Sequence, residues 1–269
     1  MAKIALAIHG GAGTILRSQM TPALDAEYRT GLETALKIGW EILEKGGSSL
    51  DAVEATVCSL EDFPLFNAGR GSVFTHEGKQ EMDACIMDGH RLNAGAVAFV
   101  KNIKNPVSLA RLVMERTEHV LLAGDGANQF AEQIGIATEP DEYFFTEHRW
   151  LQLQNAMAEG RVQLDHAVAK PMGTVGAVAC DINGHLAAAT STGGMTNKKF
   201  GRVGDTPLVG LGNYADDTVA VSCTGHGEYF MLGVTAYDVA ARMKYKGLSL
   251  ADAASETVQR LNEIKGEGG

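Results

Sequence analysis

The pair Gly173-Thr174 could supply a nucleophile that carries its own base. It follows a stretch, residues 160–172, in which hydrophobic periodicity disappears, and it precedes an apolar run. If the chain were cut between the two residues, Thr174 would gain an α-amine with a reference pKa of about 7.7 to 8.0. That amine could take the proton of the Thr174 hydroxyl, so no histidine or lysine base is needed. Gly173 suits self-cleavage because, without a Cβ, it allows a strained carbonyl.

A second threonine is expected beside the first. Asn183-Gly184 is a strong signal for a hairpin turn between two apolar runs. A two-residue turn places Thr174 opposite Gly193, whereas a one-residue bulge places it opposite Thr192. In either register the hydroxyls of Thr174 and Thr192 come within side-chain reach. Taken alone, a Gly-Thr pair before a strand is more commonly ordinary structure, so other residues must decide.

Two glycine-rich segments could complete a site. The segment 221–228, V-S-C-T-G-H-G-E, runs from an apolar strand into a helix, and its glycines expose amides of the kind that hold an oxyanion. Arg202 and Asp205 place a cation and an anion three residues apart, a pair that could hold the carboxylate and ammonium of an amino acid. The ordinary alternatives are a strand-to-helix turn and a surface ion pair worth about 0 to 1 kcal/mol.

Taken together, these segments resemble the plant-type (type III) L-asparaginase and isoaspartyl peptidase family of N-terminal nucleophile (Ntn) hydrolases. The motifs that carry the resemblance are Gly173-Thr174, Ser191-Thr192-Gly193-Gly194, the residues from Arg202 to Asp205, those from Thr224 to Gly227, the opening Ile8 to Gly13, Pro64 to Gly71, and Met82-Asp83-Ala84. They extend over essentially the whole chain. The resemblance implies an α/β fold, the αββα four-layer sandwich.

The resemblance also implies how the chain matures. The precursor is expected to cleave itself into an α subunit, residues 1–173, and a β subunit, residues 174–269, which share one structural domain. Residues 160–173 are expected to form a mobile linker. Thr174 resembles the released nucleophile, and Thr192 resembles the threonine whose hydroxyl supports its activation.

Further roles are implied for residues of the second half. Thr224, through its side chain, and Gly225, through its backbone N–H, resemble the groups that stabilise the oxyanion. Arg202 is similar to the residue that holds the α-carboxylate of the substrate, and Asp205 to the one that holds its α-ammonium. Gly227 is expected to line the same substrate-binding pocket.

The loop that follows residue 60 is implied to have two roles. Asn67 matches an asparagine placed near the nucleophile from the other half of the sandwich. The loop also resembles a sodium-binding loop that uses main-chain carbonyls, which here are those of Leu60, Glu61, Phe63, Phe66, Ala68 and Arg70. Backbone ligands leave no side-chain signature in a sequence. No cofactor is expected for catalysis, and a bound Na⁺ would be structural.

The activity implied is hydrolysis of an amide on the side-chain carboxyl of an L-aspartyl unit. β-Aspartyl dipeptides and L-asparagine are the expected small-molecule substrates, L-aspartate is the product, and a homodimer of cleaved αβ units is the expected assembly. One alternative is a glycosylasparaginase-like hydrolase, for which a secretory signal is expected and none is visible. The other is a truncated homologue that binds small amino acids or dimerises without catalysis, because family members continue for several dozen residues past the closing glycines.

Composition narrows the classes of partner. The chain has 23 Lys and Arg against 33 Asp and Glu, a net charge of −10, and no basic cluster. Neither nucleic acid nor a membrane surface is therefore an expected partner. The 4 cysteines have no C-x-x-C spacing, which favours reduced thiols and a cytoplasmic location. The glycines at 10–13 do not match a dinucleotide motif and are expected to be structural.

Helices and strands of both halves must position these residues. Apolar residues at three- and four-residue steps predict helices at about 23–45, 48–62, 106–116, 126–134, 147–159, 228–245 and 250–264. Apolar runs bounded by turn residues predict strands at about 3–9, 71–75, 94–99, 174–181, 186–191, 208–214 and 219–223. The segment 82–89 is expected to lie between two of these strands. This order favours an α/β or α+β sandwich in which the two halves share a core.

Overall fold

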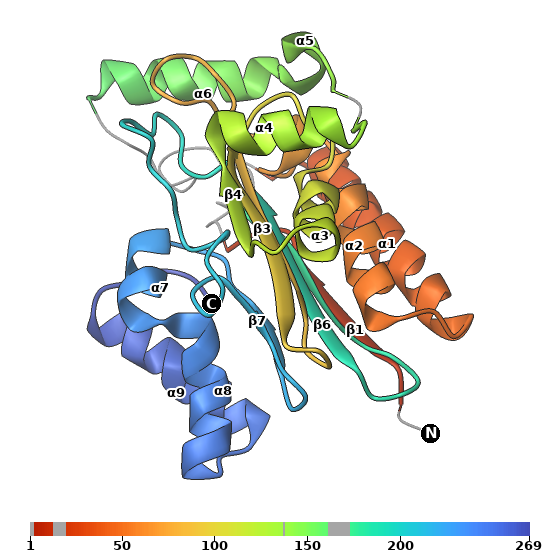
Figure 1. Ribbon diagram of the computed structural model, residues 1–269. Coiled ribbons are helices and arrows are strands. Elements are labelled where there is room, and N and C mark those ends of the chain that lie inside the picture. The colour runs from red at the N-terminus through yellow and green to blue at the C-terminus, as the bar shows by residue number, and fades with distance from the viewer. Residues whose placement is uncertain (1–2, 13–19, 137, 161–172) are drawn as a thin grey trace.

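The computed structural model describes residues 3–12, 20–136, 138–160 and 173–269, and it has four layers, αββα (Figure 1). The strands are β1 (Ala5–His9), β2 (Met82–Asp88), β3 (Asn93–Val100), β4 (Leu121–Ala123), β5 (Val175–Cys180), β6 (Leu186–Thr192), β7 (Asn213–Ala215) and β8 (Ala220–Ser222). The helices are α1 (Pro22–Glu44), α2 (Ser49–Glu61), α3 (Pro106–Arg116), α4 (Gly124–Gln133), α5 (Asp141–Phe144), α6 (Glu147–Ala158), α7 (Gly227–Gly233), α8 (Thr235–Lys246) and α9 (Leu250–Glu263).

The main sheet interleaves the two halves of the chain. Its six strands lie in the order β1-β5-β6-β2-β3-β4, and all neighbours are antiparallel except β3 and β4. The hairpin β5–β6 therefore lies between β1 and β2, which belong to the first half. The second sheet is the antiparallel pair β7–β8.

Each sheet is covered by helices on its outer face. Helices α1, α2 and α3 lie against the main sheet, and α7, α8 and α9 lie beyond the second sheet (Figure 1). Small buried residues such as Ala188 and Ala215 allow the two sheets to pack closely. Helix α2 contributes Val53, Val57 and Leu60 to the core under the main sheet. Among the residues placed in the structure, no helix is both long and apolar enough to cross a bilayer.

The caps of α1 and α2 follow from the sequence. The Thr21 hydroxyl accepts a hydrogen bond from Leu24 N at the start of α1, and the Ser48 hydroxyl accepts one from Asp51 N at the start of α2. Both caps satisfy an amide that the first helical turn leaves without a partner. The predicted helices at 23–45 and 48–62 are thereby confirmed within one or two residues.

The hairpin between β5 and β6 resolves the register that the sequence left open. Its turn has three residues, 182–184, because Val175 pairs with Ser191, Cys180 pairs with Leu186, and Asp181 N donates to His185 O at 3.0 Å. Gly184 adopts φ +84°, the left-handed conformation that such a turn requires. Thr174 therefore lies opposite Thr192, so the register with the additional turn residue is confirmed.

Several expected elements differ from the structure. The segment 71–75 forms no strand, whereas residues 82–88, expected to lie between strands, form β2 itself. The stretch 208–212 is a series of turns, so only its end contributes to β7. The predicted helix 228–245 is two helices, α7 and α8, because Val234 adopts φ +50° and breaks the hydrogen-bond ladder. The linker predicted at 160–173 lies mostly outside the described residues.

Candidate active site

The two predicted threonines meet at the end of the β5–β6 hairpin. The Thr174 hydroxyl donates to Thr192 Oγ1 at 2.9 Å, and Gly194 N donates to the same oxygen at 3.0 Å. Thr192 pairs with Asp83 of β2, which fixes the end of β6 from its other side. Thr192 is thus positioned by two neighbouring strands and accepts a hydrogen bond from the candidate nucleophile.

A pocket surrounds this pair and brings the other predicted residues to it. The residues that line the pocket are Asn67, Gly173, Thr174, Thr192, Gly194, Met195, Arg202, Gly204, Asp205, Thr206, Thr224, Gly225 and Gly227. Every catalytic, substrate-binding and cleavage-site position taken from the sequence is among them. The structure therefore places these residues together, and the role of each stays a prediction.

Thr224 and Gly225 face the pocket from an extended turn before α7. Ala12 N donates to Thr224 Oγ1 at 3.2 Å, so the Thr224 hydroxyl keeps its own proton to donate. Thr224 N and His226 N donate to Gly269 O and Glu267 O, both at 2.9 Å. Because successive amides of extended backbone point to opposite sides, the Gly225 N–H points away from that pairing. Two donors are thus available for an oxyanion.

Arg202 is held by a carboxylate that the sequence analysis missed. Its Nε and one terminal nitrogen donate to the two oxygens of Glu228, both at 2.9 Å. His226 Nε2 lies 3.3 Å from the same carboxylate. Burial raises the pKa of Glu228, but its bonds to Arg202 outweigh burial and lower it. A substrate carboxylate would therefore share Arg202 with Glu228, whose position in the first turn of α7 gave no signal in the sequence.

Asp205 is a buried carboxyl that forms no ion pair with any residue the structure describes. It is 6% exposed, and its Oδ2 has no hydrogen-bond partner in the described part of the chain. A Cβ on Gly212 or Gly227 would lie 2.6 or 2.8 Å from its oxygens, so only glycine fits on either side. Burial raises the pKa of Asp205 to about 7, against the lowering effects of a backbone hydrogen bond and of Arg202. An ammonium group would supply the missing partner.

Asn67 shapes the floor of the pocket. Its Nδ2 donates to Gly194 O at 2.8 Å, and its Oδ1 accepts from Val73 N at 3.0 Å. Gly193 N donates to the Asn67 carbonyl at 3.1 Å. The amide thus fixes the turn that follows Thr192, and it does so across the two halves of the chain.

The glycine cluster at 10–13 contributes more than sequence reasoning assigned to it. Gly11 has φ +119°, and a Cβ there would lie 2.2 Å from Gly173 N. Only glycine allows the segment after β1 to pass this close to the expected cleavage position. Together with the contact from Ala12 to Thr224, this places the segment directly against two residues that line the pocket.

The loop after α2, for which the sequence predicts a sodium site, holds several main-chain carbonyls close to its glycines. A Cβ on Gly71 would lie 2.0 Å from Phe66 O and 2.5 Å from Pro64 O, and one on Gly69 would lie 2.5 Å from Glu61 O, so these carbonyl oxygens lie close to the two glycines. Carbonyl oxygens suit hard cations. In the resolved ranges, no cluster of three His, Cys, Asp or Glu side chains could hold a metal.

A buried arginine that the sequence analysis missed supports the same loop. Arg149 of α6 is 1% exposed, and its Nε donates to Gly71 O at 2.7 Å. A terminal nitrogen donates to Leu65 O at 3.4 Å. Neither of these two carbonyls belongs to the predicted sodium ligands.

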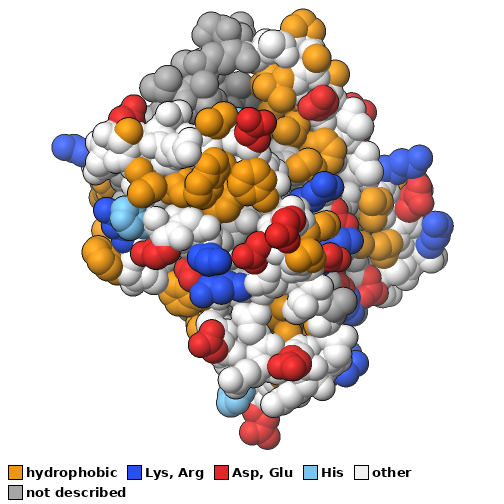
Figure 2. Space-filling model, turned by 90° about the horizontal axis from the view of Figure 1, so that it is seen from above, with side chains coloured by type: hydrophobic (Ala, Val, Ile, Leu, Met, Phe, Trp, Pro, Cys, Tyr) orange, Lys and Arg blue, Asp and Glu red, His pale blue; other side chains and the backbone are white. Residues whose placement is uncertain are grey.

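A second pocket has no comparable chemistry. It has a volume of about 410 Å³ and is walled by Phe74, Phe145 and Trp150, whose rings meet edge to face or tilted. Its rim carries the ion pair of Lys79 with Asp141 at 3.5 Å. Figure 2, a view onto this end of the molecule, shows hydrophobic side chains gathered among both signs of charge. Its lining lacks a positioned nucleophile, so the threonine pocket is the candidate active site.

Comparisons with known proteins agree with this assignment. The model of the asparaginase family matches residues 2–269. An isoaspartyl peptidase of Salmonella typhimurium is 53% identical over 276 residues, which cover 100% of this chain and 88% of that protein. An isoaspartyl peptidase/L-asparaginase of Xenopus laevis is 46% identical over 99% of this chain and 84% of its own. A probable isoaspartyl peptidase/L-asparaginase 2 of Arabidopsis thaliana is 40% identical over 96% and 86%, respectively. The family match and these identities show that the chain belongs to the plant-type asparaginase and isoaspartyl peptidase family of Ntn hydrolases.

Proposed function

We propose that the protein is an isoaspartyl peptidase and L-asparaginase that activates itself by cleavage between Gly173 and Thr174. The observation that carries the proposal is the convergence of the Thr174–Thr192 hydroxyl pair with two oxyanion donors and an Arg202–Asp205 pair in one pocket. The names of its relatives support the same activity. The substrates are β-aspartyl dipeptides and L-asparagine.

The reaction proceeds through an acyl-enzyme. The α-amine of Thr174 takes the hydroxyl proton as Oγ1 attacks the side-chain carbonyl of the substrate. Thr224 and Gly225 N donate to the resulting oxyanion. The ammonium of Thr174 then protonates the leaving nitrogen, and ammonia or an amino acid departs. Water, deprotonated by the same amine, hydrolyses the ester, releases L-aspartate and restores the Thr174 hydroxyl.

The two ends of the substrate explain the selectivity. Arg202 binds the free α-carboxylate, and Asp205 binds the α-ammonium. An ordinary α-linked peptide lacks that free carboxylate, so only a β-linked aspartyl unit presents its scissile carbonyl to Thr174. Holding both ends fixes the carbonyl near the nucleophile, which lowers the entropic part of the barrier.

The decisive experiment compares Thr174→Ala with Thr174→Ser. By length, cleavage of the 28.5 kDa chain gives fragments of about 18 and 10 kDa on a denaturing gel. The serine variant, which keeps a hydroxyl, should cleave slowly and release L-aspartate from β-aspartyl dipeptides. The alanine variant should stay in one piece and release none. Fragments and full activity from Thr174→Ala would refute the mechanism, and a persistent single band for the native chain would favour a non-catalytic binder.

We also propose that Na⁺ binds the loop after α2. The main-chain carbonyls of Leu60, Glu61, Phe63, Phe66, Ala68 and Arg70 would hold it. A bound cation would supply rigidity to the loop that presents Asn67, and it takes no part in the chemical steps. The midpoint of thermal unfolding should be higher in sodium chloride than in choline chloride at equal ionic strength, and equal midpoints would contradict the site.

Assembly and location complete the proposal. We propose a homodimer of cleaved αβ units in the cytoplasm, and the four free thiols suit a reducing compartment. Light scattering should then give a mass of about twice 28.5 kDa in dilute solution. A mass that stays at the single-chain value would exclude the dimer.

A further inference from the structure

A histidine at the end of β1 contacts the candidate nucleophile from behind. His9 Nδ1 lies 3.1 Å from the Thr174 carbonyl oxygen, and His9 Nε2 lies 2.8 Å from Ser222 Oγ. His9 pairs with Gly176 in the main sheet, whereas Ser222 ends β8 of the second sheet. The imidazole therefore joins the backbone of residue 174 to the opposite sheet. It does not line the substrate pocket.

The contact continues through buried polar groups. Ser222 Oγ lies 2.7 Å from Thr190 Oγ1, and Asn213 Nδ2 donates to Thr190 Oγ1 at 3.0 Å. Thr190 and Asn213 are both fully buried. The four side chains, from β7, β6, β8 and β1, thus form one relay that ends at the Thr174 carbonyl. We call it the Asn213–His9 relay.

The Thr174 carbonyl, at one end of the relay, determines the direction of every hydrogen bond in it. A carbonyl can only accept, so His9 Nδ1 carries the proton and Nε2 accepts. Ser222 must then donate to His9, and Thr190 must donate to Ser222. The competing acceptors, Ala189 O for Ser222 and Gly212 O for Thr190, are farther away, at 3.5 and 3.4 Å. The relay therefore fixes one tautomer of the ring.

Two further observations fit a neutral, fixed ring. Burial lowers the pKa of His9 to about 4, although its hydrogen bond to Thr174 raises it. A Cβ on Gly176 would lie 2.0 Å from Ser222 Oγ and 2.4 Å from His9 Nε2. The absence of a side chain at Gly176 thus leaves room for the hydrogen bond between His9 and Ser222, which links the two sheets.

We propose that His9 is a positioning residue for Thr174, held as its Nδ1–H tautomer by the Asn213–His9 relay so that it fixes the carbonyl of the nucleophile. Once residue 173 no longer tethers Thr174, its position depends on β5, on Thr192 and on this hydrogen bond. The effect on turnover rests on the proposed function, whereas the tautomer does not.

The tautomer can be observed directly. We expect ¹⁵N NMR of histidine-labelled protein to show His9 with a protonated Nδ1 and an unprotonated Nε2 at pH 7. Ser222→Ala removes the donor to Nε2, so the ¹⁵N shift of Nε2 should change, whereas Nδ1 should stay protonated because the Thr174 carbonyl still accepts from it. A protonated Nε2 in the native protein, or unchanged His9 shifts in Ser222→Ala, would overturn the proposal whether or not the protein is active.

Two amide replacements test the contact itself. An asparagine at position 9 can place its Nδ2 donor where Nδ1 of histidine lies, whereas a glutamine reaches toward the Nε2 position. His9→Gln should lower kcat about tenfold to a hundredfold with little change in KM, and His9→Asn should recover much of that loss. Equal kcat values for the two variants, or a change confined to KM, would contradict a positioning role.

A matched control separates this effect from general destabilisation. Thr56→Val removes a hydroxyl that is as deeply buried as that of Thr190 but that donates only within its own helix, to Ala52 O. Thr56→Val should leave kcat and the His9 shifts unchanged, whereas Thr190→Val should alter both and Thr190→Ser should restore them. If the native protein cleaves no substrate, the proposed function fails, and the NMR result still decides the relay.

Discussion

Asp205 is placed so that it can bind a ligand, and the same placement should lower the stability of the fold. Its carboxyl is enclosed by glycines and has no ion-pair partner in the described ranges, and burial raises its pKa to about 7. The ionised form is the one that binds an ammonium group, so proton loss and ligand binding are linked. The free site should therefore be half protonated near neutral pH.

Ligand binding should weaken as the pH falls. L-Alanine carries only the α-carboxylate and α-ammonium, so as a competitive inhibitor it reports on Arg202 and Asp205 without a side-chain carboxylate near Thr174. We expect its inhibition constant to rise about tenfold per unit below pH 7 and to level off above it. Asp205→Asn should bind weakly at every pH. An inhibition constant that is flat between pH 5 and 8 in the native protein would contradict the assignment of Asp205.

The same residue should oppose stability. Because its folded-state pKa is raised from 3.8 to about 7, the folded chain binds more protons than the unfolded chain in that window, and stability is lost as the pH rises through it. Asp205→Asn should therefore increase the free energy of unfolding at pH 8 by on the order of 1 kcal/mol, and less at pH 5. Urea unfolding at both pH values measures this, and a loss of stability at pH 8 would show that Asp205 has a partner.

At the scale of elements, the break between α7 and α8 carries local strain. Val234 has φ +50° and ψ 46°, is 44% exposed, and makes no side-chain bond as the N-cap of α8. A β-branched residue disfavours this conformation, whereas asparagine tolerates it and can cap a helix. Val234→Asn should stabilise the fold by roughly 1 kcal/mol in urea unfolding. The control Val258→Asn, inside α9, should destabilise it, and the same sign for both would refute the strain.

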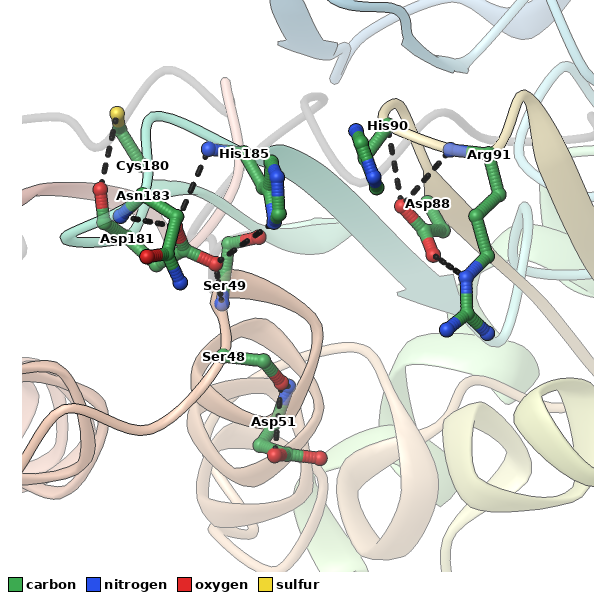
Figure 3. Close-up of polar contacts among 10 residues, drawn as sticks. All are labelled: Ser48, Ser49, Asp51, Asp88, His90, Arg91, Cys180, Asp181, Asn183 and His185. Atoms are coloured by element: carbon green, nitrogen blue, oxygen red, sulfur yellow. Dashed lines mark hydrogen bonds and ion pairs between the residues drawn. The ribbon is translucent and has the colours of Figure 1, made fainter.

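The turn between β5 and β6 is held by more hydrogen bonds than the neighbouring turn between β2 and β3. Asp181 is 1% exposed and accepts hydrogen bonds from Asn183 N, His185 N and, at the start of α2, Ser49 N (Figure 3). Asp88 accepts from two amides of its own turn and lies 3.9 Å from Arg91 Nε, so all its described partners belong to that turn. Asp181→Ala should cost about 2 to 3 kcal/mol in urea unfolding and Asp88→Ala about 1, because only the former leaves buried donors unpaired. Equal costs would show that the link to α2 contributes nothing.

Local signals in the sequence predicted the elements that depend on local chemistry. Ser48 and Asp51 marked the start of α2, and Asn183-Gly184 marked the hairpin that aligns Thr174 with Thr192. Strand β2 was missed because its residues are buried on both faces and show no alternation. The segment 71–75 was wrongly predicted as a strand, since Arg149, whose bond to Gly71 O helps to hold this region as a loop, lies far away in the sequence.

The sequence was sufficient to predict the residues of the site, but not the side chains that hydrogen-bond to them. All the residues for which the family motifs predicted a catalytic, substrate-binding or cleavage role line the threonine pocket. Glu228 behind Arg202 and His9 behind Thr174 were not assigned, because each acts through a contact between distant segments. Periodicity and turn signals report on neighbours in sequence, whereas these contacts appear only when the sheets are assembled.

At the scale of the whole molecule, the order of strands decides what cleavage can do. The hairpin β5–β6 is hydrogen-bonded to β1 on one side and to β2 on the other. After cleavage before Thr174, the second fragment would still lie inside the sheet of the first. Separating the fragments would expose the strand edges and core residues such as Val175 and Ala189 to water.

The cleaved fragments should therefore stay together until the fold is lost. Gel filtration without denaturant should give one peak that contains both the 18 and 10 kDa species, and the two should separate in urea at the concentration where the circular dichroism of the sheet disappears. Thr174→Ala, which stays in one piece, should unfold with a midpoint that depends less on protein concentration than the midpoint of the cleaved protein. The cleaved protein should show a midpoint that rises with concentration, because its unfolding releases two chains. Fragments that separate while the circular dichroism is unchanged would mean that β5 and β6 are not interleaved with β1 and β2 in the mature protein.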